Sequence, residues 1–535
     1  MDTAVRTLVC AVVVVGLAAA ARAQEDHEDQ ENEGPGMPYV APDEPVQTSV
    51  PFMDRSFFNG VQVNVNAQGL NALNDAANEP SMAVNPTNPL NIVIGWRQFD
   101  NIVSNFRQAG FAYTLDGGVT WHNAGPYSPG VFRSDPVLAC DPDGRFVYDS
   151  LQVTPSYCTD ALISLDGGAT WSEPHPMIGG DKAWMCVDPT AGPGRGQLYS
   201  SWTSGFTCDT GSSSFVRSVD HGETWAGAGW VSPSTWGTMD VDADGVLYAV
   251  DGNGYVSRSV SARDRLQPVV FGTPVQALPG TNGVAYGCVQ NPGGLCGQAW
   301  IACDRSGGPT RNNVYVVCPS SMTGQSDLDV WFARSVDGGL TWSAPARLND
   351  EPAGARVNQW FANLSVAPNG RIDVTYNDAR FGLSAVFYVH SYDGGVTWSV
   401  PRQLTSTFNS RQGWPTQDKM GDYNQLISQE DCALLAYAAT FNLGANGQGQ
   451  QDVWFLRIPA SPCDSVDFNL DGLIPDFADV TDFVQVFMGG VCEGQAPGSV
   501  PCNTDIDFNN DGIFPDTTDI SALISVFSGG PCIEG

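Results

Sequence analysis

Short apolar runs separated by polar turns make up most of the chain. Two examples are Asn91-Ile-Val-Ile-Gly-Trp96 and Asn313-Val-Tyr-Val-Val317, which are rich in β-branched and aromatic residues. Runs of this kind, bounded by Gly, Pro and Asp, are typical of short β-strands, and helix signals are scarce. The pattern therefore predicts an all-β protein with many short strands.

One turn motif, Ser/Thr-x-Asp-x-Gly-x-Thr-Trp, occurs five times between such runs. An Asp-Gly turn between two apolar runs is a signal of a β-hairpin. The Gly can adopt the positive φ of a tight turn, and the Asp carboxylate can accept hydrogen bonds from backbone N–H groups of its own turn. The Trp begins the next strand and is large enough to pack between sheets. The copies lie at residues 114–121, 164–171, 218–225, 335–342 and 391–398.

The motif belongs to a larger unit of four strands, in which it joins the third strand to the fourth. We count seven units. The seventh lacks the motif and is identified by the match of Val330-Trp-Phe-Ala-Arg334 to Val453-Trp-Phe-Leu-Arg457, and Val61-Gln-Val-Asn-Val65 would supply its fourth strand and close a ring. Such a repeat predicts a β-propeller of four-stranded blades over residues 61–460. The unit near residues 239–259 also lacks the motif, so six blades is the alternative count.

The five motifs resemble the Asp-box, or BNR repeat, of the sialidase superfamily. In that family the box is a structural turn, so the resemblance implies that these Asp residues shape turns rather than catalyse a reaction. In an up-and-down blade, the 3–4 turns that carry the boxes share one face with the 1–2 turns. The 2–3 turns and the links between blades form the opposite face. We expect ligands on that opposite face, around the axis.

The sequence is strongly acidic, with 58 Asp and Glu against 24 Lys and Arg and a formal net charge of −34. This charge disfavours nucleic acid and anionic membrane surfaces as partners and favours cations such as calcium. An acidic surface that keeps the protein soluble is the alternative explanation.

The N-terminus has the pattern of an export signal. Arg6 precedes the apolar segment 8–21, and Ala21-Arg-Ala23 is a small-x-small cleavage site. Residues 1–23 are therefore expected to be a signal peptide, and residues 24–60, which are acidic and rich in Pro, a flexible leader. No later apolar run is long enough to span a bilayer. We expect a secreted protein, extracellular or periplasmic.

Cysteines are clustered in a way that suits disulfides in an oxidising compartment. Of the 14 Cys, Cys10 lies in the signal peptide, which leaves an odd number. Cys432, alone in an apolar run, is expected to be the unpaired, buried thiol. The clusters are Cys140/Cys158, Cys186/Cys208 and Cys288/Cys296/Cys303/Cys318.

Residues 463–535 contain a second repeat, in which Asp-x-Asn-x-Asp-Gly occurs twice, 40 residues apart. It has the opening of an EF-hand loop, where three oxygen ligands alternate along the chain and Gly allows a sharp turn. The pair resembles a dockerin, a calcium-binding module whose known partners are cohesins. The resemblance implies calcium and a cohesin-like or cell-surface partner, and a non-binding acidic turn is the alternative. The implied ligands are Asp467, Asn469, Asp471, Leu473, Asp479, Asp507, Asn509, Asp511, Ile513 and Asp519.

Sialidase catalysis needs three Arg that bind the sugar carboxylate, a Tyr nucleophile and an Asp acid or base. The family's first Arg precedes a conserved Ile-Pro, and here Asn78 stands at that place before Glu79-Pro80. Other polar residues end strands on the face opposite the boxes, although a salt bridge or loop hydrogen bond is the alternative for each alone. The candidates are Tyr423 as nucleophile or stacking residue, Asp135 and Asp181 as acid/base, and Arg97, Arg133, Lys182, Arg356, Arg380 and Asp422 as substrate-binding residues.

Two functions remain open. The first is a secreted glycoside hydrolase of exo-α-sialidase type that acts on extracellular glycans. The second is a non-catalytic propeller that binds a glycan, glycoconjugate or protein and is displayed through the calcium module. The sequence has no His cluster, Cys-x-x-Cys, Gly-x-Ser-x-Gly or phosphate loop, which argues against zinc, serine-hydrolase and nucleotide chemistry.

Overall fold

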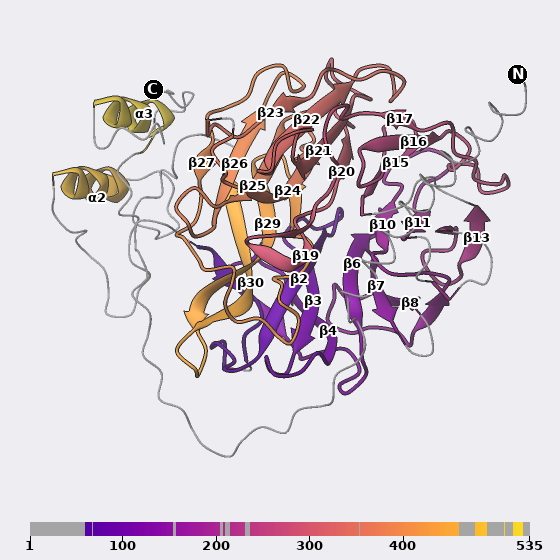
Figure 1. Cartoon of the computed structure of the whole chain (residues 1–535), viewed down its shortest axis with the longest axis horizontal. Helices are drawn as coiled ribbons and strands as arrows, with labels where there is room; N and C mark the ends of the chain where they lie inside the picture. Colours follow the sequence, from indigo (N-terminus) through magenta and orange to yellow (C-terminus); the bar gives the residue numbers. More distant parts are fainter. Residues whose placement is uncertain are drawn as a thin grey trace, which may run out of the picture.

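The described part of the chain forms a seven-bladed β-propeller. The computed structural model describes residues 59–66, 68–153, 157–203, 207–208, 214–229, 236–352, 354–459, 477–488, 508 and 517–527. Within them, seven four-stranded antiparallel sheets surround a central axis (Figure 1). The prediction of an all-β propeller with seven four-stranded blades is confirmed, and the alternative count of six is wrong.

Each blade follows the up-and-down order expected from the repeat, with its first strand nearest the axis. Blades 1 to 4 are β2 (Ala76–Val84), β3 (Ile92–Phe99), β4 (Arg107–Thr114), β5 (His122–Asn123); β6 (Ser134–Cys140), β7 (Phe146–Gln152), β8 (Cys158–Ser164), β9 (His175–Met177); β10 (Trp184–Val187), β11 (Leu198–Ser201), β12 (Phe215–Ser218), β13 (Ala226–Gly229); β14 (Met239–Val241), β15 (Leu247–Val250), β16 (Tyr255–Ser259), β17 (Val275–Gln276). Blades 5 to 7 are β20 (Trp300–Cys303), β21 (Val314–Ser320), β22 (Asp329–Ser335), β23 (Ala346–Arg347); β24 (Gln359–Val366), β25 (Ile372–Asp378), β26 (Ala385–Ser391), β27 (Arg402–Gln403); β28 (Gln425–Ser428), β29 (Cys432–Leu443), β30 (Gly449–Pro459) and β1.

The ring is closed by β1 (Val61–Gln62), which is the fourth strand of blade 7. Val61 pairs with Phe455 and Gln62 with Trp454, antiparallel to β30. The prediction that the segment starting at Val61 completes the last blade is therefore confirmed. An additional hairpin of β18 (Tyr286–Cys288) and β19 (Asn291–Leu295) lies in the link between blades 4 and 5 and was not predicted.

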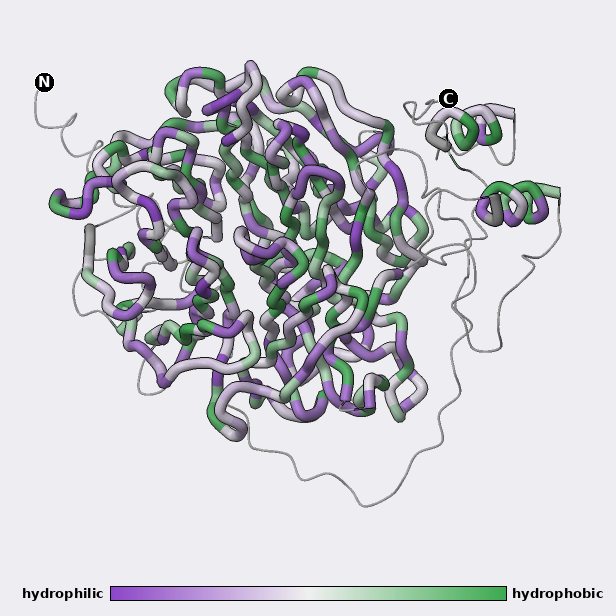
Figure 2. Tube along the Cα trace, turned by 180° about the vertical axis from the view of Figure 1, so that it is seen from behind, coloured by the Kyte–Doolittle hydropathy of each residue, from purple (hydrophilic) through white to green (hydrophobic). Residues whose placement is uncertain are grey.

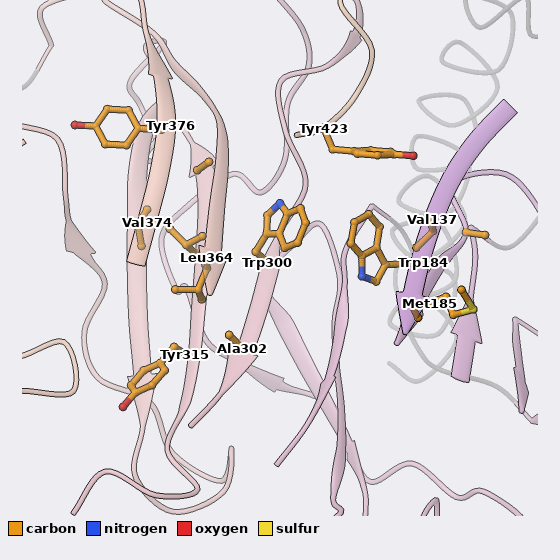
Figure 3. Packing of buried hydrophobic residues seen from close by; sticks show 14 of the residues in the cluster. Val137, Trp184, Met185, Trp300, Ala302, Tyr315, Leu364, Val374, Tyr376 and Tyr423 are labelled. Carbon is orange, nitrogen blue, oxygen red and sulfur yellow. The ribbon is translucent and has the colours of Figure 1, made fainter. Parts of the chain in front are cut away.

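The core lies between the blades, where apolar inner strands pack against one another. Hydrophobic and hydrophilic stretches alternate along the chain (Figure 2). Near the axis, the ring of Trp184 lies 4.8 Å from that of Trp300 and 5.5 Å from that of Tyr423, edge to face in both pairs (Figure 3). Blades also approach closely at Gly95, where a Cβ would stand 2.3 Å from the Tyr148 ring. These contacts fix the blades around the axis.

The Asp-box motifs form the 3–4 turns, as the sequence predicts. In blade 5, the Asp337 carboxylate accepts hydrogen bonds from the backbone N–H of Leu340 and Thr341 and from the Thr341 hydroxyl, at 3.1, 2.9 and 2.6 Å. Burial opposes ionisation, but the hydrogen bonds from Thr341 and Ser335 prevail and lower the pKa of Asp337 to about 2. The Asp337 carboxylate therefore accepts its hydrogen bonds from groups of its own turn.

Two disulfides join described cysteines, Cys158–Cys208 and Cys288–Cys296. Cys432 is buried and unpaired, which confirms that prediction. The expectation that Cys140 pairs within its cluster is wrong. Cys140 ends β6 on the Asp-box face, whereas Cys158 begins β8 on the opposite face, so closeness in sequence does not bring them together. Among the described residues, the other unpaired cysteines, also contrary to expectation, are Cys186, Cys303 and Cys318.

Two helices follow the propeller, α2 (Phe477–Phe487) and α3 (Thr517–Phe527). Their small core contains Phe483, Phe508, Ala522 and Leu523, and the rings of Phe483 and Phe508 meet edge to face at 5.8 Å. Nowhere in the described chain is a helix both long and apolar enough to cross a membrane. The expected signal peptide, and the expected leader apart from residues 59–60, lie outside the described residues.

Candidate functional site

In every blade the backbone kinks at one residue, at or just before the first strand. The residue at the kink has a positive φ, and in blades 1, 2 and 6 the pairing of the first two strands shifts there. A positive φ is unfavourable for residues other than Gly, so the surrounding structure must hold each kink in place. The seven kinked residues are Glu79, Asp135, Lys182, Trp236, Gly297, Phe361 and Gly421.

The kinks of blades 1, 2 and 3 and the residue after the kink of blade 7 bring charged side chains together at the axis. We call this set the axial cluster. All of its members are buried, with at most 5% of their surface exposed. Its members are Glu79, Arg97, Asp135, Asp181, Lys182, Lys419 and Asp422.

Ion pairs connect the axial cluster across blades. The ammonium groups of Lys182 and Lys419 lie 2.7 and 3.1 Å from the same oxygen of Asp422, Oδ2. Arg97 Nε lies 3.1 Å from Glu79 Oε2 and donates to Asn78 at 2.9 Å. Asn78 therefore orients Arg97 from the neighbouring strand.

Burial and the neighbouring cations shift the pKa values of the cluster's carboxyl groups in opposite directions. Burial raises the pKa of Glu79 to about 8, against the attraction of Arg97. Burial would also raise the pKa of Asp422, but Lys182 and Lys419 hold it well below its usual range. The pKa of Asp135 is lowered for the same reason, chiefly by Lys182. At neutral pH the cluster therefore contains ionised Asp135 and Asp422 and a protonated Glu79.

Lys182 and Lys419 are the only lysines in the sequence; the rest of its 24 Lys and Arg residues are Arg. Both are buried at the axis and share Asp422. Sequence reasoning selected Lys182 but missed Lys419, Glu79 as a charged partner and the relation between them. The rarity of lysine was the signal that could have found this pair.

The predicted nucleophile Tyr423 lies beside the axial cluster. Its hydroxyl donates a 2.7 Å hydrogen bond to the backbone carbonyl of Pro136, toward the strand that carries Val137 (Figure 3). Burial raises its pKa well above the usual range. Its contacts are those of a packing residue that joins blades 7 and 2, and a nucleophilic role for it stays a prediction.

A second polar set lies between blades 5 and 6 on the same face, since β25 ends there and the β23–β24 link crosses it. We call it the Arg380 cluster. Unlike the axial cluster it reaches solvent: the side chains of Arg380 and Asp350 are 22% and 46% exposed. Its members are Asn349, Asp350, Glu351, Gln359, Asp378 and Arg380.

Glu351 and Asp378 form the centre of the Arg380 cluster. Arg380 contacts Glu351 and donates to Asp378 at 3.0 Å and to Asp350 at 2.6 Å. The Asn349 amide donates to Glu351 at 3.0 Å. Burial raises the pKa of Glu351 to about 7, with help from the negative charge of Asp378 and from a hydrogen bond that the protonated Glu351 donates to Asp378. Glu351 can therefore hold a proton near neutral pH.

The remaining predicted residues lie apart from these two clusters. Arg133 is buried and pairs with Asp160 at 2.6 Å. Arg356 is exposed in the β23–β24 link, and its backbone N–H donates to Asp327 at 3.2 Å. The structure thus brings Arg97, Asp135, Asp181, Lys182, Asp422 and Tyr423 together at the axis and leaves Arg133 and Arg380 in separate ion pairs.

Of the predicted calcium ligands, Asp479 and Asp519 are described. Each is buried and occupies the first turn of its helix, α2 or α3. A carboxylate there is also favourable toward the helix dipole without any ion. The other eight predicted ligands lie outside the described residues.

No family model and no curated protein matches this chain. It is similar in fold to an α-L-arabinofuranosidase from Fusarium graminearum, with 12% identity over 75% of this chain and 98% of the other and a TM-score of 0.40. A sialidase from Streptococcus pneumoniae shares 11% identity over 75% and 70%, with a TM-score of 0.38. A fungal alcohol oxidase in complex with copper shares 13% over 78% of each chain, with a TM-score of 0.47. At this level the likeness carries nothing about function.

Proposed function

We propose that this protein is a secreted glycoside hydrolase that acts on extracellular glycans, with the Arg380 cluster as its reaction centre. One observation supports it above all. On the face opposite the Asp-boxes, Glu351, whose pKa is raised to about 7, lies beside Asp378 and the partly exposed guanidinium of Arg380. A carboxyl group that is protonated near neutral pH is suited to general acid catalysis.

The proposed reaction is a hydrolysis in which the carboxyl pair handles the proton. The pair gives its proton to the glycosidic oxygen, and the bond from that oxygen to the sugar carbon breaks. Water adds to the sugar carbon and returns a proton to the pair. Arg380 holds a negatively charged group of the substrate, such as a sugar carboxylate, since a guanidinium matches its geometry.

The test is turnover of fluorogenic glycosides by the purified protein with calcium, beginning with an α-sialoside because of the Asp-box resemblance. We expect Glu351→Gln to lower kcat by about 10²–10⁴-fold, the usual contribution of a general acid. Wild-type activity is expected to fall as the pH rises through about 7, where Glu351 loses its proton.

Two variants control this experiment. Glu430→Gln makes the same change at an exposed glutamate of the β28–β29 turn, on the Asp-box face, and should leave turnover unchanged. Tyr423→Phe separates the two candidate centres, because a nucleophilic tyrosine would be essential. Turnover abolished by Tyr423→Phe but retained by Glu351→Gln would move the reaction centre to the axis. No turnover by a folded protein on any glycoside would refute the hydrolase.

A non-catalytic binding propeller is the second candidate. It is favoured by the burial of the axial cluster and by the hydrogen bond that occupies the Tyr423 hydroxyl. It predicts retention of a glycan or glycoprotein on an array without product release. In that case Arg380→Ala should abolish retention, whereas Glu351→Gln should not.

We also propose that the C-terminal module binds two calcium ions. The matching positions of Asp479 and Asp519 in two 11-residue helices support this, as does the repeated acidic loop before each helix. The measurement is calorimetric titration of the full chain with calcium, compared with Asp467→Ala/Asp507→Ala. The wild type should bind two calcium ions and the double variant none. Identical titrations would refute calcium binding by these loops. A cohesin-like or cell-surface partner would follow from the module and is tested by pull-down with and without chelator.

A further inference from the structure

The hairpin of β18 and β19 lies directly on the axial cluster. In Figure 1, β19 stands at the centre of the ring of blades. The backbone N–H of Leu295 donates to Asp422 Oδ1 at 2.8 Å, and that of Gly293 donates to the Asp418 carbonyl at 3.0 Å. A Cβ on Gly294 would stand 2.7 Å from Asp422 Oδ1 and 2.8 Å from Lys419 Cδ. The hairpin backbone therefore touches the charged groups themselves.

Hydrogen bonds from Asn291 and a disulfide fasten the hairpin. The Asn291 amide group donates to the Gly421 carbonyl at 2.8 Å, and its oxygen accepts from the Met420 N–H at 2.7 Å. The disulfide Cys288–Cys296 links the last residue of β18 to the residue that follows β19. The segments held together in this way are the links before blade 5 and before blade 7.

We propose that this hairpin is a cover whose opening exposes the axial cluster, and with it Lys182 and Lys419, to solvent. The cluster has three cationic and four acidic side chains with little exposed surface, and it is stabilised only while its partners stay paired. The hairpin supplies one of those pairings, to Asp422. Its disulfide and the Asn291 bonds keep that pairing in place. The inference concerns access to the cluster and does not depend on the proposed hydrolase.

Because the sequence has two lysines, an amine-reactive reagent reports on this cluster almost alone. The experiment is timed acylation of the folded full chain with N-hydroxysuccinimidyl acetate, with Lys419 followed by peptide mass spectrometry. Gly294→Ala places a Cβ against Asp422 and Lys419 and should force the hairpin outward. We expect acylation of Lys419 to rise by about tenfold or more.

Gly307→Ala is the matched control, since a Cβ there meets nothing within 4 Å. It should leave the rate within about twofold of the wild type. A Gly294→Ala rate equal to that of Gly307→Ala would overturn the proposal. The role of the disulfide is tested by Cys288→Ser/Cys296→Ser against Cys158→Ser/Cys208→Ser. We expect Lys419 to be acylated faster only in Cys288→Ser/Cys296→Ser. Equal acylation rates in the two double variants would show that the Cys288–Cys296 disulfide does not hold the cover.

Discussion

The axial cluster and the Arg380 cluster use the same chemical groups on the same face of the propeller, yet they differ in access to water. At the axis, seven ionisable side chains are buried and two lysines share one carboxylate. Between blades 5 and 6, Arg380 remains 22% exposed beside Glu351, whose pKa is raised to about 7. Buried charges that lose a partner are expensive, whereas exposed ones are rehydrated. The difference in exposure supports our proposal that the Arg380 cluster, rather than the axis, is the reaction centre.

The largest effect is expected from Lys419→Met, which removes one cation of the axis at similar volume. Asp422 would lose one of its two buried lysine partners, and the cost should be about 3–5 kcal/mol of unfolding free energy. Denaturant unfolding measures it. The control is Arg457→Met, whose partner Asp431 is 71% exposed and whose loss should cost about 0–1 kcal/mol. Equal costs would contradict the distinction between buried and exposed clusters.

The pH dependence of stability should also come from the axis. The folded pKa of Glu79 is about 8, above its ordinary value of 4.5. Its contribution to stability is therefore full below pH 4.5 and is lost as the pH rises through about 8. We expect Glu79→Gln to reduce the fall in Tm between pH 5 and 8, and Glu430→Gln to leave it unchanged. If Tm fell between pH 5 and 8 as steeply in Glu79→Gln as in the wild type, Glu79 would be ionised in the folded protein.

The Arg380 cluster should respond to the loss of its cation through its proton. Arg380 favours the ionised form of the carboxyl pair, so Arg380→Ala should raise the pKa of Glu351 further, by about one unit. The alkaline limb of the pH–activity profile should move upward by the same amount. Arg457→Ala, the same change at an exposed arginine, should not move the alkaline limb. An unchanged limb in Arg380→Ala would separate Arg380 from the proton-holding pair.

The smallest effect is expected on the opposite face. Asp337→Ala removes the hydrogen bonds that the carboxylate accepts from Leu340 and Thr341, and should cost about 1 kcal/mol. The low pKa of Asp337 means that this contribution is present above pH 3.8 and is lost toward pH 2. Thermal unfolding at pH 7 measures the cost, and turnover should stay unchanged. A loss of turnover would give the box a role beyond its turn.

The repeat made the fold predictable, because each blade carries its own strand and turn signals. Even the seventh blade was accessible, since Val453 to Arg457 repeats Val330 to Arg334, and the segment at Val61 offered the closing strand. The kinks at Glu79, Asp135 and Lys182 were not predictable, because a positive φ there is imposed by neighbouring strands rather than by local preference.

The site was harder to predict because ring closure brings distant segments together. Lys419 meets Lys182 through Asp422, although more than half of the propeller separates them in sequence. Glu351 and Asp378 come from a link and a strand end, and the raised pKa of Glu351 depends on burial that sequence spacing does not encode. The β18–β19 hairpin has weak strand signals, with Pro292 and two Gly in β19.

The closure of blade 7 also decides which way the molecule can be held. β30 is the third strand of its blade, so it ends at Pro459 on the Asp-box side, where β1 begins. Both ends of the propeller leave from one point at the edge of that side. A molecule suspended from residues after Pro459 would turn its boxes toward its support and present the hairpin, the axis and Arg380 outward. The same attachment would load a single blade under tension, so blade 7 is where a pulled propeller should begin to unravel.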